Sequence, residues 1–175
     1  MLQSRMIVSR GMTAAADESP AGEDAGLWLT PGQLASWLSV VRLITRLPWA
    51  IDAQLLRDAD LSMIEYMTMA MSGAPARTLR MSELAERTSS SLSRLSHLVK
   101  RLESRGYVRR EADPADGRFT NAILLPAGLT KLESAAPAHV AYVRRLVVDN
   151  LSPERLRRLG QDADRIVGRI DSPAR

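Results

Sequence analysis

Apolar residues recur at intervals of three and four along most of this chain, which is the period of an amphipathic helix. The first apolar stripe covers residues 34–47, in a helix predicted to begin at Pro31. Pro48 is expected to kink or break that helix, because proline has no backbone N–H to continue the hydrogen-bond ladder. The next helix is predicted from Ser62 to about residue 72, since Ser62 and Glu65 have the spacing of a capping box.

Shorter elements separated by turn residues follow. A helix is predicted from Ser82, as its N-cap, to about residue 87, and a serine-rich turn leads into a second helix over residues 92–105 that ends at Gly106. Residues 107–111 and 121–125 are typical of two short strands, and the turn-forming residues between them predict a β-hairpin. Helix, short helix, turn, helix and hairpin in this order predict a winged helix-turn-helix.

The turn between the two helices has an unusual residue. With Ala85 at the close crossing of the two helices, Ser89 falls in the turn, where glycine is more common. Leu92, Leu95 and Leu98 of the second helix then face inward, and the period also places Glu103 among the apolar side chains.

Two further helices complete the chain. One is predicted from Ala127 to about residue 149, with a bend at Pro137, and the last begins with Ser152 as N-cap and Pro153 in its first turn. Apolar stripes on the first and last helices have no obvious partner within so small a winged lobe, and burial between two chains would cover them.

The fold class is therefore mainly α, a winged helix-turn-helix lobe with an N- and C-terminal helical dimerisation region. The predicted lobe covers residues 59–125, and the dimerisation region covers residues 31–58 and 126–172. Residues 1–30 contain little apolar periodicity and are predicted to be a disordered tail.

Composition excludes several classes of protein. The 175 residues include no cysteine, which rules out a disulfide scaffold, a cysteine-ligated zinc site and thiol-based sensing of peroxide. The two histidines are distant in the chain and have no metal-ligand spacing, so neither a metal nor another cofactor is expected. Catalytic triads, phosphate-binding glycine loops and dinucleotide fingerprints are missing, which argues against an enzyme. No apolar run spans a membrane and no signal peptide is evident, so a cytoplasmic protein is expected.

Positive charge gathers in the predicted winged lobe. The formal net charge of +4 combines a tail of −2 with +6 over the remaining residues, and residues 80–118 hold nine basic and six acidic side chains. A basic surface on a small domain favours a polyanionic partner. The excess of arginine over lysine is ambiguous, since codon bias would produce it as well as phosphate recognition.

One face of the second helix of the motif carries hydroxyl and basic groups and no acid. Such a face suits the major groove, where hydroxyls bind phosphate and Arg, Lys or His reach base edges. A solvated surface of a helix is also normally charged, and the adjacent hairpin is what favours DNA. The candidate DNA-binding residues on this element are Ser90, Ser91, Ser93, Arg94, His97, Lys100 and Arg101.

The hairpin tip contributes Arg118, a candidate for insertion into a narrow, electronegative minor groove. Asp116 is expected either to orient Arg118 or to pair with Arg94 of the helix. An Asp-Pro-x-Asp-Gly segment also forms an ordinary turn without any function, so the tip alone is weak evidence.

Three segments of this chain resemble the MarR (multiple antibiotic resistance regulator) family. They are residues 79–85, residues 93–108 and the turn at 113–118, and the segment Leu124-Leu125-Pro126-Ala127-Gly128 resembles the Leu-Thr-Pro-Ala-Gly of the family, with Leu125 in place of the Thr. The resemblance covers about residues 33–170. It implies a homodimer on a pseudo-palindromic double-stranded DNA operator, usually a repressor, with Ser91, Ser93, Arg94 and His97 at the major groove and Arg118 at the minor groove.

The resemblance also implies a small lipophilic or phenolic effector held between the dimer base and the DNA-binding lobe. Candidate lining residues are Trp37, Arg42, Tyr66, Met67, Met69, Ala70 and Met81. Methionines and a tryptophan at helical spacing are equally expected in an ordinary core. A constitutive regulator or an activator without an effector therefore remains an alternative, as does a winged helix that contacts only proteins.

Overall fold

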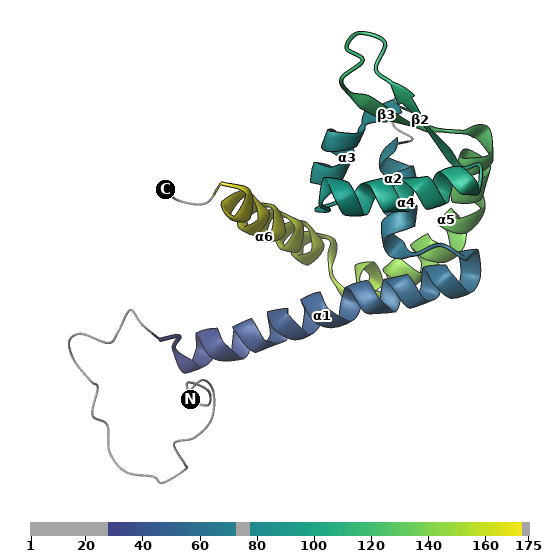
Figure 1. Cartoon of the computed structure of the whole chain (residues 1–175). Helices are drawn as coiled ribbons and strands as arrows, with labels where there is room; N and C mark the ends of the chain where they lie inside the picture. The colour runs from purple at the N-terminus through teal and green to yellow at the C-terminus, as the bar shows by residue number, and fades with distance from the viewer. Residues whose placement is uncertain (1–27, 73–77, 173–175) are drawn as a thin grey trace, which may run out of the picture. The chain divides into compact units, whose positions relative to one another are not determined.

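The computed structural model describes residues 28–72 and 78–172 (Figure 1). The chain divides into two compact units, residues 1–42 and 43–175, and the first helix runs across the division. Most of the predicted tail lies outside the described residues. The elements in chain order are α1 (Pro31–Ala59), α2 (Met63–Ser72), β1 (Thr78–Arg80), α3 (Met81–Arg87), α4 (Leu92–Ser104), β2 (Val108–Ala112), β3 (Thr120–Leu124), α5 (Pro126–Leu146), the 3-10 helix η1 (Val148–Asn150) and α6 (Pro153–Asp171).

Helix α1 continues through Pro48, so the predicted break is wrong. Proline removes one donor from the ladder and leaves the carbonyl of residue 44 without its usual partner. The side chains of Ile44 and Pro48 are both exposed, and the helix continues although this backbone hydrogen bond is missing. Its start is fixed by reciprocal bonds, since Thr30 N–H donates to Gln33 Oε1 at 2.9 Å and Gln33 N–H to Thr30 Oγ1 at 3.3 Å.

The capping box predicted for α2 is confirmed. Ser62 N–H donates to Glu65 Oε2 at 2.9 Å, and Glu65 N–H donates to Ser62 Oγ at 3.3 Å. Asp52 of α1 adds a third cap, because its Oδ1 accepts the N–H of Met63 at 2.7 Å. The start of α2 is thus attached to α1 as well as to its own first turn.

The hairpin belongs to a three-stranded antiparallel sheet with the order β1-β3-β2. The sequence did not predict β1, because three residues are too few to show an alternating pattern. This strand also displaces the predicted start of α3. Arg80 pairs with Asn121 of β3 and keeps an extended backbone, so α3 begins at Met81, with Arg80 and not Ser82 in the N-cap position.

The turn between α3 and α4 is a Schellman motif. Ser90 N–H donates to the carbonyl of Ala85 and Ser89 N–H to that of Glu86, while Ser89 has a positive φ of 49°. Helix α4 ends in the same way at Gly106, with φ 70°. The prediction that Ser89 occupies a position usual for glycine is confirmed by this backbone conformation.

The core of the second unit lies between the helices and one face of the sheet. Helix α4 packs on α3 and β2, and α2 packs on α5 and β3. Leu92 differs from the prediction, since it is 55% exposed at the first position of α4. The fully buried large apolar side chains are Leu55, Leu61, Met69, Leu84, Leu95, Leu102, Val99 and Val108.

Helix α5 is shorter than predicted. The backbone leaves the helical region at Val147, and η1 follows. Asn150 Nδ2 donates to the carbonyl of Arg145 at 2.7 Å, which satisfies one carbonyl of the last turn. Helix α6 has the predicted N-cap, because Ser152 Oγ accepts the N–H of Arg155 at 3.3 Å.

The first turn of α5 lies directly against the end of the α4 motif. Leu125 N–H donates to the carbonyl of Tyr107 at 2.9 Å. A Cβ atom on Gly128 would lie 2.3 Å from that carbonyl oxygen and 2.8 Å from Leu124 Cδ1. Only glycine therefore permits this approach of helix to backbone.

We expect Gly128→Ala to lower the free energy of unfolding by about 1–3 kcal/mol, because a backbone carbonyl must move to admit the methyl group. Alanine normally stabilises a helix relative to glycine. Gly168→Ala in α6 is the matched control, since no atom lies within 4 Å of the added Cβ. Urea unfolding followed by circular dichroism measures both, and equal stabilities of the two variants would contradict the close approach.

Ser89→Gly is expected to raise the free energy of unfolding by about 1 kcal/mol, because a Cβ atom is strained at positive φ. The reciprocal substitution Gly106→Ala, at the equivalent position of α4, should lower the free energy of unfolding by a similar amount. Thermal unfolding of the two variants measures the effects. Changes of the same sign at both positions would show that the left-handed conformation is not what determines them.

Candidate nucleic-acid interface

Helix α4 is fixed at both ends and presents one face to solvent. Ser91 is its N-cap, with Oγ accepting the N–H of Arg94 at 3.3 Å. The opposite face is buried through Leu95, Leu98 and Leu102. Because the buried stripe fixes the rotation of the helix, the predicted DNA-contacting side chains face outward: Ser91, Ser93, Arg94, His97, Lys100 and Arg101 are exposed and Ser90 is half-buried.

The basic side chains on this face differ in their partners. Arg101 lies 3.3 Å from Glu65 Oε1 at the start of α2, and that carboxylate is nearly buried. Within residues 28–72 and 78–172, no carboxylate pairs with Arg94 or Lys100. Arg94 and Lys100 therefore keep their charge available to an external anion, while Arg101 shares its charge with Glu65.

Glu103 does not lie among apolar side chains as predicted. Its carboxylate accepts the backbone N–H of Arg110 at 3.0 Å and the guanidinium of the same residue at 2.8 Å. These bonds, the backbone one foremost, hold the pKa of Glu103 below its ordinary value. The acid thus joins α4 to β2 and leaves the outer face of the helix without negative charge.

The loop between β2 and β3 forms the predicted wing, which projects from the sheet in Figure 1. Asp116 holds Arg118 through two bonds, Nε to Oδ1 at 2.9 Å and Nη2 to Oδ2 at 2.6 Å. The side-chain bonds from Arg118 keep the pKa of Asp116 below its ordinary value. Of the two roles expected for Asp116, the structure shows the orientation of Arg118 and not a pair with Arg94.

Arg118 remains 86% exposed although it is held by Asp116. An arginine at a loop tip otherwise samples many rotamers, and ordering it on binding costs free energy. The bidentate pair with Asp116 orients the guanidinium before any partner arrives.

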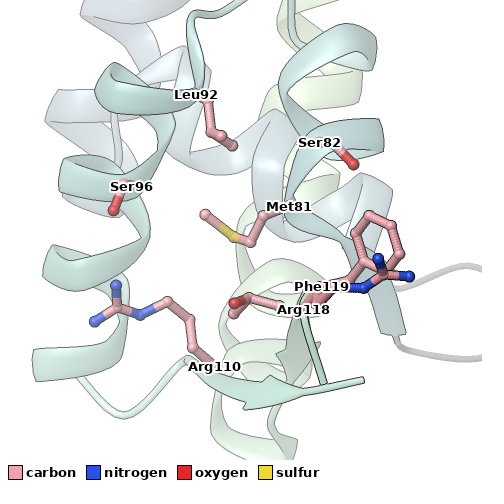
Figure 2. A pocket seen from close by; sticks show the side chains of 8 residues that line it. Met81, Ser82, Leu92, Ser96, Arg110, Arg118 and Phe119 are labelled. Atoms are coloured by element: carbon pink, nitrogen blue, oxygen red, sulfur yellow. The ribbon is translucent and has the colours of Figure 1, made fainter. Parts of the chain in front are cut away.

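A hollow of about 260 Å³ lies between α4, the start of α3 and the wing (Figure 2). Met81 and Leu92 point into it from the two helices, and Arg110 borders it from β2. Leu92 is thus exposed to this hollow and not to the core. The remaining lining residues are Ser82, Ser96, Arg118, Phe119 and Thr120.

The residues predicted to line an effector pocket do not share one environment. Trp37 and Arg42 belong to the first unit and are exposed there. Met69 is fully buried in the core, and Met81 belongs to the core and borders the hollow. Ala70 is exposed and Met67 is half-buried. For Met69 the structure agrees with the core alternative.

Tyr66 lies in a cluster with His139 and Gln54 that the sequence did not identify. Its ring is 4.7 Å from the ring of His139 on α5, and His139 Nδ1 lies 3.3 Å from Oε1 of the buried Gln54 on α1. Burial raises the pKa of Tyr66 and lowers that of His139. Neutral forms of both side chains are therefore favoured where α1, α2 and α5 meet.

No described helix is sufficiently long and apolar to cross a membrane. Over residues 28–72 and 78–172, acidic and histidine side chains also form no group of three placed to hold a metal ion.

Comparison with known proteins places this arrangement in a family. A model described as "MarR family" matches residues 68–118, from α2 to the wing tip. Sco3205 from Streptomyces coelicolor, a MarR family transcriptional regulator solved in complex with DNA, is 41% identical over 84% of this chain and 96% of its own, with a TM-score of 0.78. The chain belongs to the MarR family.

Two other solved structures extend the comparison. AbsC, a MarR family transcriptional regulator from Streptomyces coelicolor, is 33% identical, with 83% of this chain and 98% of its own covered and a TM-score of 0.78. A mutant of MarR from E. coli, complexed with operator DNA, shares the fold at 20% identity and a TM-score of 0.64, covering 76% of this chain and 96% of its own. A search of the curated proteins gave no significant match.

The winged-helix fold expected from the sequence is confirmed, and the relatives in this family are transcriptional regulators. Sequence analysis did not identify Arg80, Asp113 or Phe119 as site residues, because their contacts join β1 to the wing loop. β1 was not predicted, and the contact between Arg80 and Asp113 spans 33 residues.

Proposed function

We propose that this MarR family chain is a sequence-specific DNA-binding transcriptional regulator, which acts as a repressor on a pseudo-palindromic operator in the cytoplasm. The observation that carries the proposal is the pairing of an acid-free outer face on α4 with an arginine pre-ordered at the wing tip. A helix of this kind reads the major groove and an arginine of this kind enters the minor groove. The relative that is 41% identical and bound to DNA supports the same function.

Each candidate residue has a role in this proposal. Arg94, His97 and Lys100 would face base edges and phosphates of the major groove. Ser90, Ser91 and Ser93 would bind phosphate near the helix N-terminus, where backbone amides also attract anions. Arg101 would engage a phosphate by exchanging Glu65 for it, and Asp116 would hold Arg118 in the minor groove.

Homodimerisation is the second part of the proposal. Helices α1 and α6 expose many large apolar side chains in the single chain, among them Leu38 and Ile44 on α1 and Ile166 and Ile170 on α6. Exposed apolar surface on this scale is typical of a protein interface. We assign residues 31–58 and 126–172 to the dimerisation region, residues 59–125 to the DNA-binding lobe and residues 1–30 to a disordered tail. Two lobes then read half-sites about 34–36 Å apart.

An effector is the third part. The partly buried Tyr66 beside His139, at the meeting of α1, α2 and α5, favours a small lipophilic or phenolic ligand over a charged one. The alternative is a regulator or activator that has no effector. Thermal-shift screening with salicylate and related phenols separates the two, because an effector must raise the unfolding temperature and also release DNA.

Arg118→Ala is expected to weaken operator binding by roughly 10- to 100-fold, because one minor-groove contact and its charge are lost. Arg94→Ala should weaken binding and also relax base preference in the major groove. The probe is a duplex that the full-length chain selects from a random library, measured by fluorescence anisotropy. Arg165→Ala is the matched control, since it removes a similarly exposed, carboxylate-paired arginine from α6.

The selection has three outcomes for the function. Enrichment of a palindromic sequence followed by weaker binding of the Arg118 and Arg94 variants supports it. Failure to enrich any sequence, or affinities of both variants equal to that of the Arg165 control, would contradict it. Binding of all duplexes with equal affinity and a steep salt dependence would instead show non-specific phosphate binding.

Ile166→Glu is expected to shift the chain from dimer to monomer, because a carboxylate would have to be buried in the apolar interface. Gln161→Glu introduces the same charge on the opposite side of α6 and should leave the dimer intact. Sedimentation velocity measures the two masses at several protein concentrations. A wild-type chain that sediments as a monomer would refute the dimer.

A further inference from the structure

The wing loop is attached to the strand that enters the helix-turn-helix motif. Arg80 is the last residue of β1 and directly precedes α3. Its Nε donates to Asp113 Oδ2 at 3.0 Å, across 33 residues of sequence. Asp113 follows β2 immediately and opens the wing loop. One side chain thus links the start of the loop to the start of α3.

Asp113 organises the loop as well as receiving Arg80. Its Oδ1 accepts the N–H groups of Ala115 at 2.9 Å and of Asp116 at 3.3 Å. The N–H of Ala115, foremost, and the other bonds hold the pKa of Asp113 below its ordinary value. Only 10% of this side chain is exposed although it belongs to a surface loop. The carboxylate is therefore engaged on both oxygens and remains ionised at neutral pH.

The same guanidinium contacts the far end of the loop. The Cζ atom of Arg80 lies 4.5 Å from the centre of the Phe119 ring, in cation–π geometry. Backbone bonds close the loop between these ends, since Asp113 N–H donates to the carbonyl of Phe119 at 2.9 Å and Phe119 N–H to that of Asp116 at 3.0 Å. Phe119 directly follows Arg118, and both side chains line the hollow shown in Figure 2. Arg80 therefore holds both the first and the last residue of the loop that carries Arg118.

We propose that Arg80, acting through Asp113 and Phe119, is a positioning residue that fixes the wing relative to the helix-turn-helix motif. The inference rests on the proposed DNA-binding function and adds a determinant of its specificity. Its consequence is geometric: the distance between Arg118 in the minor groove and α4 in the major groove is set before DNA binds. Arg80 itself is directed at Asp113 and Phe119 rather than at phosphate.

Ordering of the wing loop before binding is the physical reason why Arg80 should affect the affinity for DNA. An exposed ion pair alone contributes little to folding. A loop whose ends are held, however, loses less conformational entropy when its tip enters the groove. Releasing the loop should therefore weaken DNA binding more than it weakens the fold.

Asp113→Asn provides a test in which the change of charge and the loss of loop positioning have opposite effects on the affinity for DNA. The substitution makes the chain more positive by one charge, and electrostatic attraction to DNA alone would strengthen binding. Loss of the ionic contact with Arg80 should instead weaken binding by roughly 3- to 30-fold, which lies within the range of couplings between residues in one network. Glu111→Gln is the matched control, because it adds the same charge to β2 at a side chain that pairs with Arg109 and not with the loop.

A double-mutant cycle identifies the residue through which Arg80 acts on DNA. In an Arg118→Ala background, Asp113→Asn and Arg80→Gln should no longer weaken binding through the wing. If Arg80 instead contacted phosphate directly, Arg80→Gln would weaken binding equally in both backgrounds and reduce the salt slope by about one.

Minor-groove discrimination is a readout that a purely structural role would not change. At the base pairs under the wing, replacing A·T by G·C adds the 2-amino group of guanine to the minor groove. Replacing A·T by inosine·cytosine (I·C) does not add this group. The wild-type chain should prefer A·T and I·C over G·C, and the Asp113→Asn and Arg80→Gln chains should lose that preference. Preference in the major groove, tested at base pairs under α4, should be retained in both variants.

The probe is the duplex selected from a random library by the wild-type chain, with each variant first checked by its thermal unfolding midpoint. The proposal is overturned if Asp113→Asn binds as tightly as Glu111→Gln, or if its loss persists undiminished beside Arg118→Ala. Should Asp113→Asn fail to fold, Arg80→Gln alone decides, by losing or keeping the A·T preference. Failure of the DNA-binding function is a separate result, because the wild-type chain would then select no duplex.

Discussion

The carbonyl group of Tyr107 is the point on which the DNA-facing part of the molecule depends. Helix α4 ends shortly before it, β2 begins one residue after it, and its oxygen accepts the N–H of Leu125 at the start of α5. Gly128 brings the first turn of α5 against the same carbonyl. Three elements are therefore joined where no side chain fits between them, and the angles of α4 and of the hairpin are both set there.

Three acidic side chains of the lobe are paired with arginines and lie away from the outer face of α4. The +3 excess of residues 80–118 is small, but Glu103, Asp113 and Asp116 all bind arginines within the lobe. Each acid orients a cation or joins two elements, and none is left on the outer face of α4. The distribution of charge, rather than its total, favours a polyanion on this side.

Local sequence signals predicted local structure well. Caps and turns such as Ser62 with Glu65, Ser152 and Gly106 act within a few residues, so their spacing was sufficient. The signals failed where distant segments decide. The pairing of β1 with β3, for example, moved the start of α3 to Met81.

The residues of the candidate site also separate into those that local signals identified and those that depend on contacts between distant segments. Helical periodicity identified the outward residues of α4, and a turn motif identified Asp116 and Arg118. Periodicity cannot distinguish a cation that is paired across elements from one that is not, so Arg101 and Arg94 looked equivalent until Glu65 was located beside Arg101. Arg80 and Asp113 were missed for the same reason, since nothing in either local sequence indicates the other.

The hairpin is held by contacts at both of its ends, and these contacts limit how it can move relative to the helices. At its base, the Tyr107 carbonyl and the β2–β3 register fix the strands to α4 and α5. At its loop, Arg80 joins the first and last loop residues, Asp113 and Phe119, to the start of α3. A hairpin held at one end can swing, whereas one held at both ends moves with the helices to which it is attached. With Arg80 in the positioning role proposed above, α4 and the wing would move as one unit. A ligand that released DNA would then have to shift this unit as a whole, because bending the wing alone would break the contacts of Arg80.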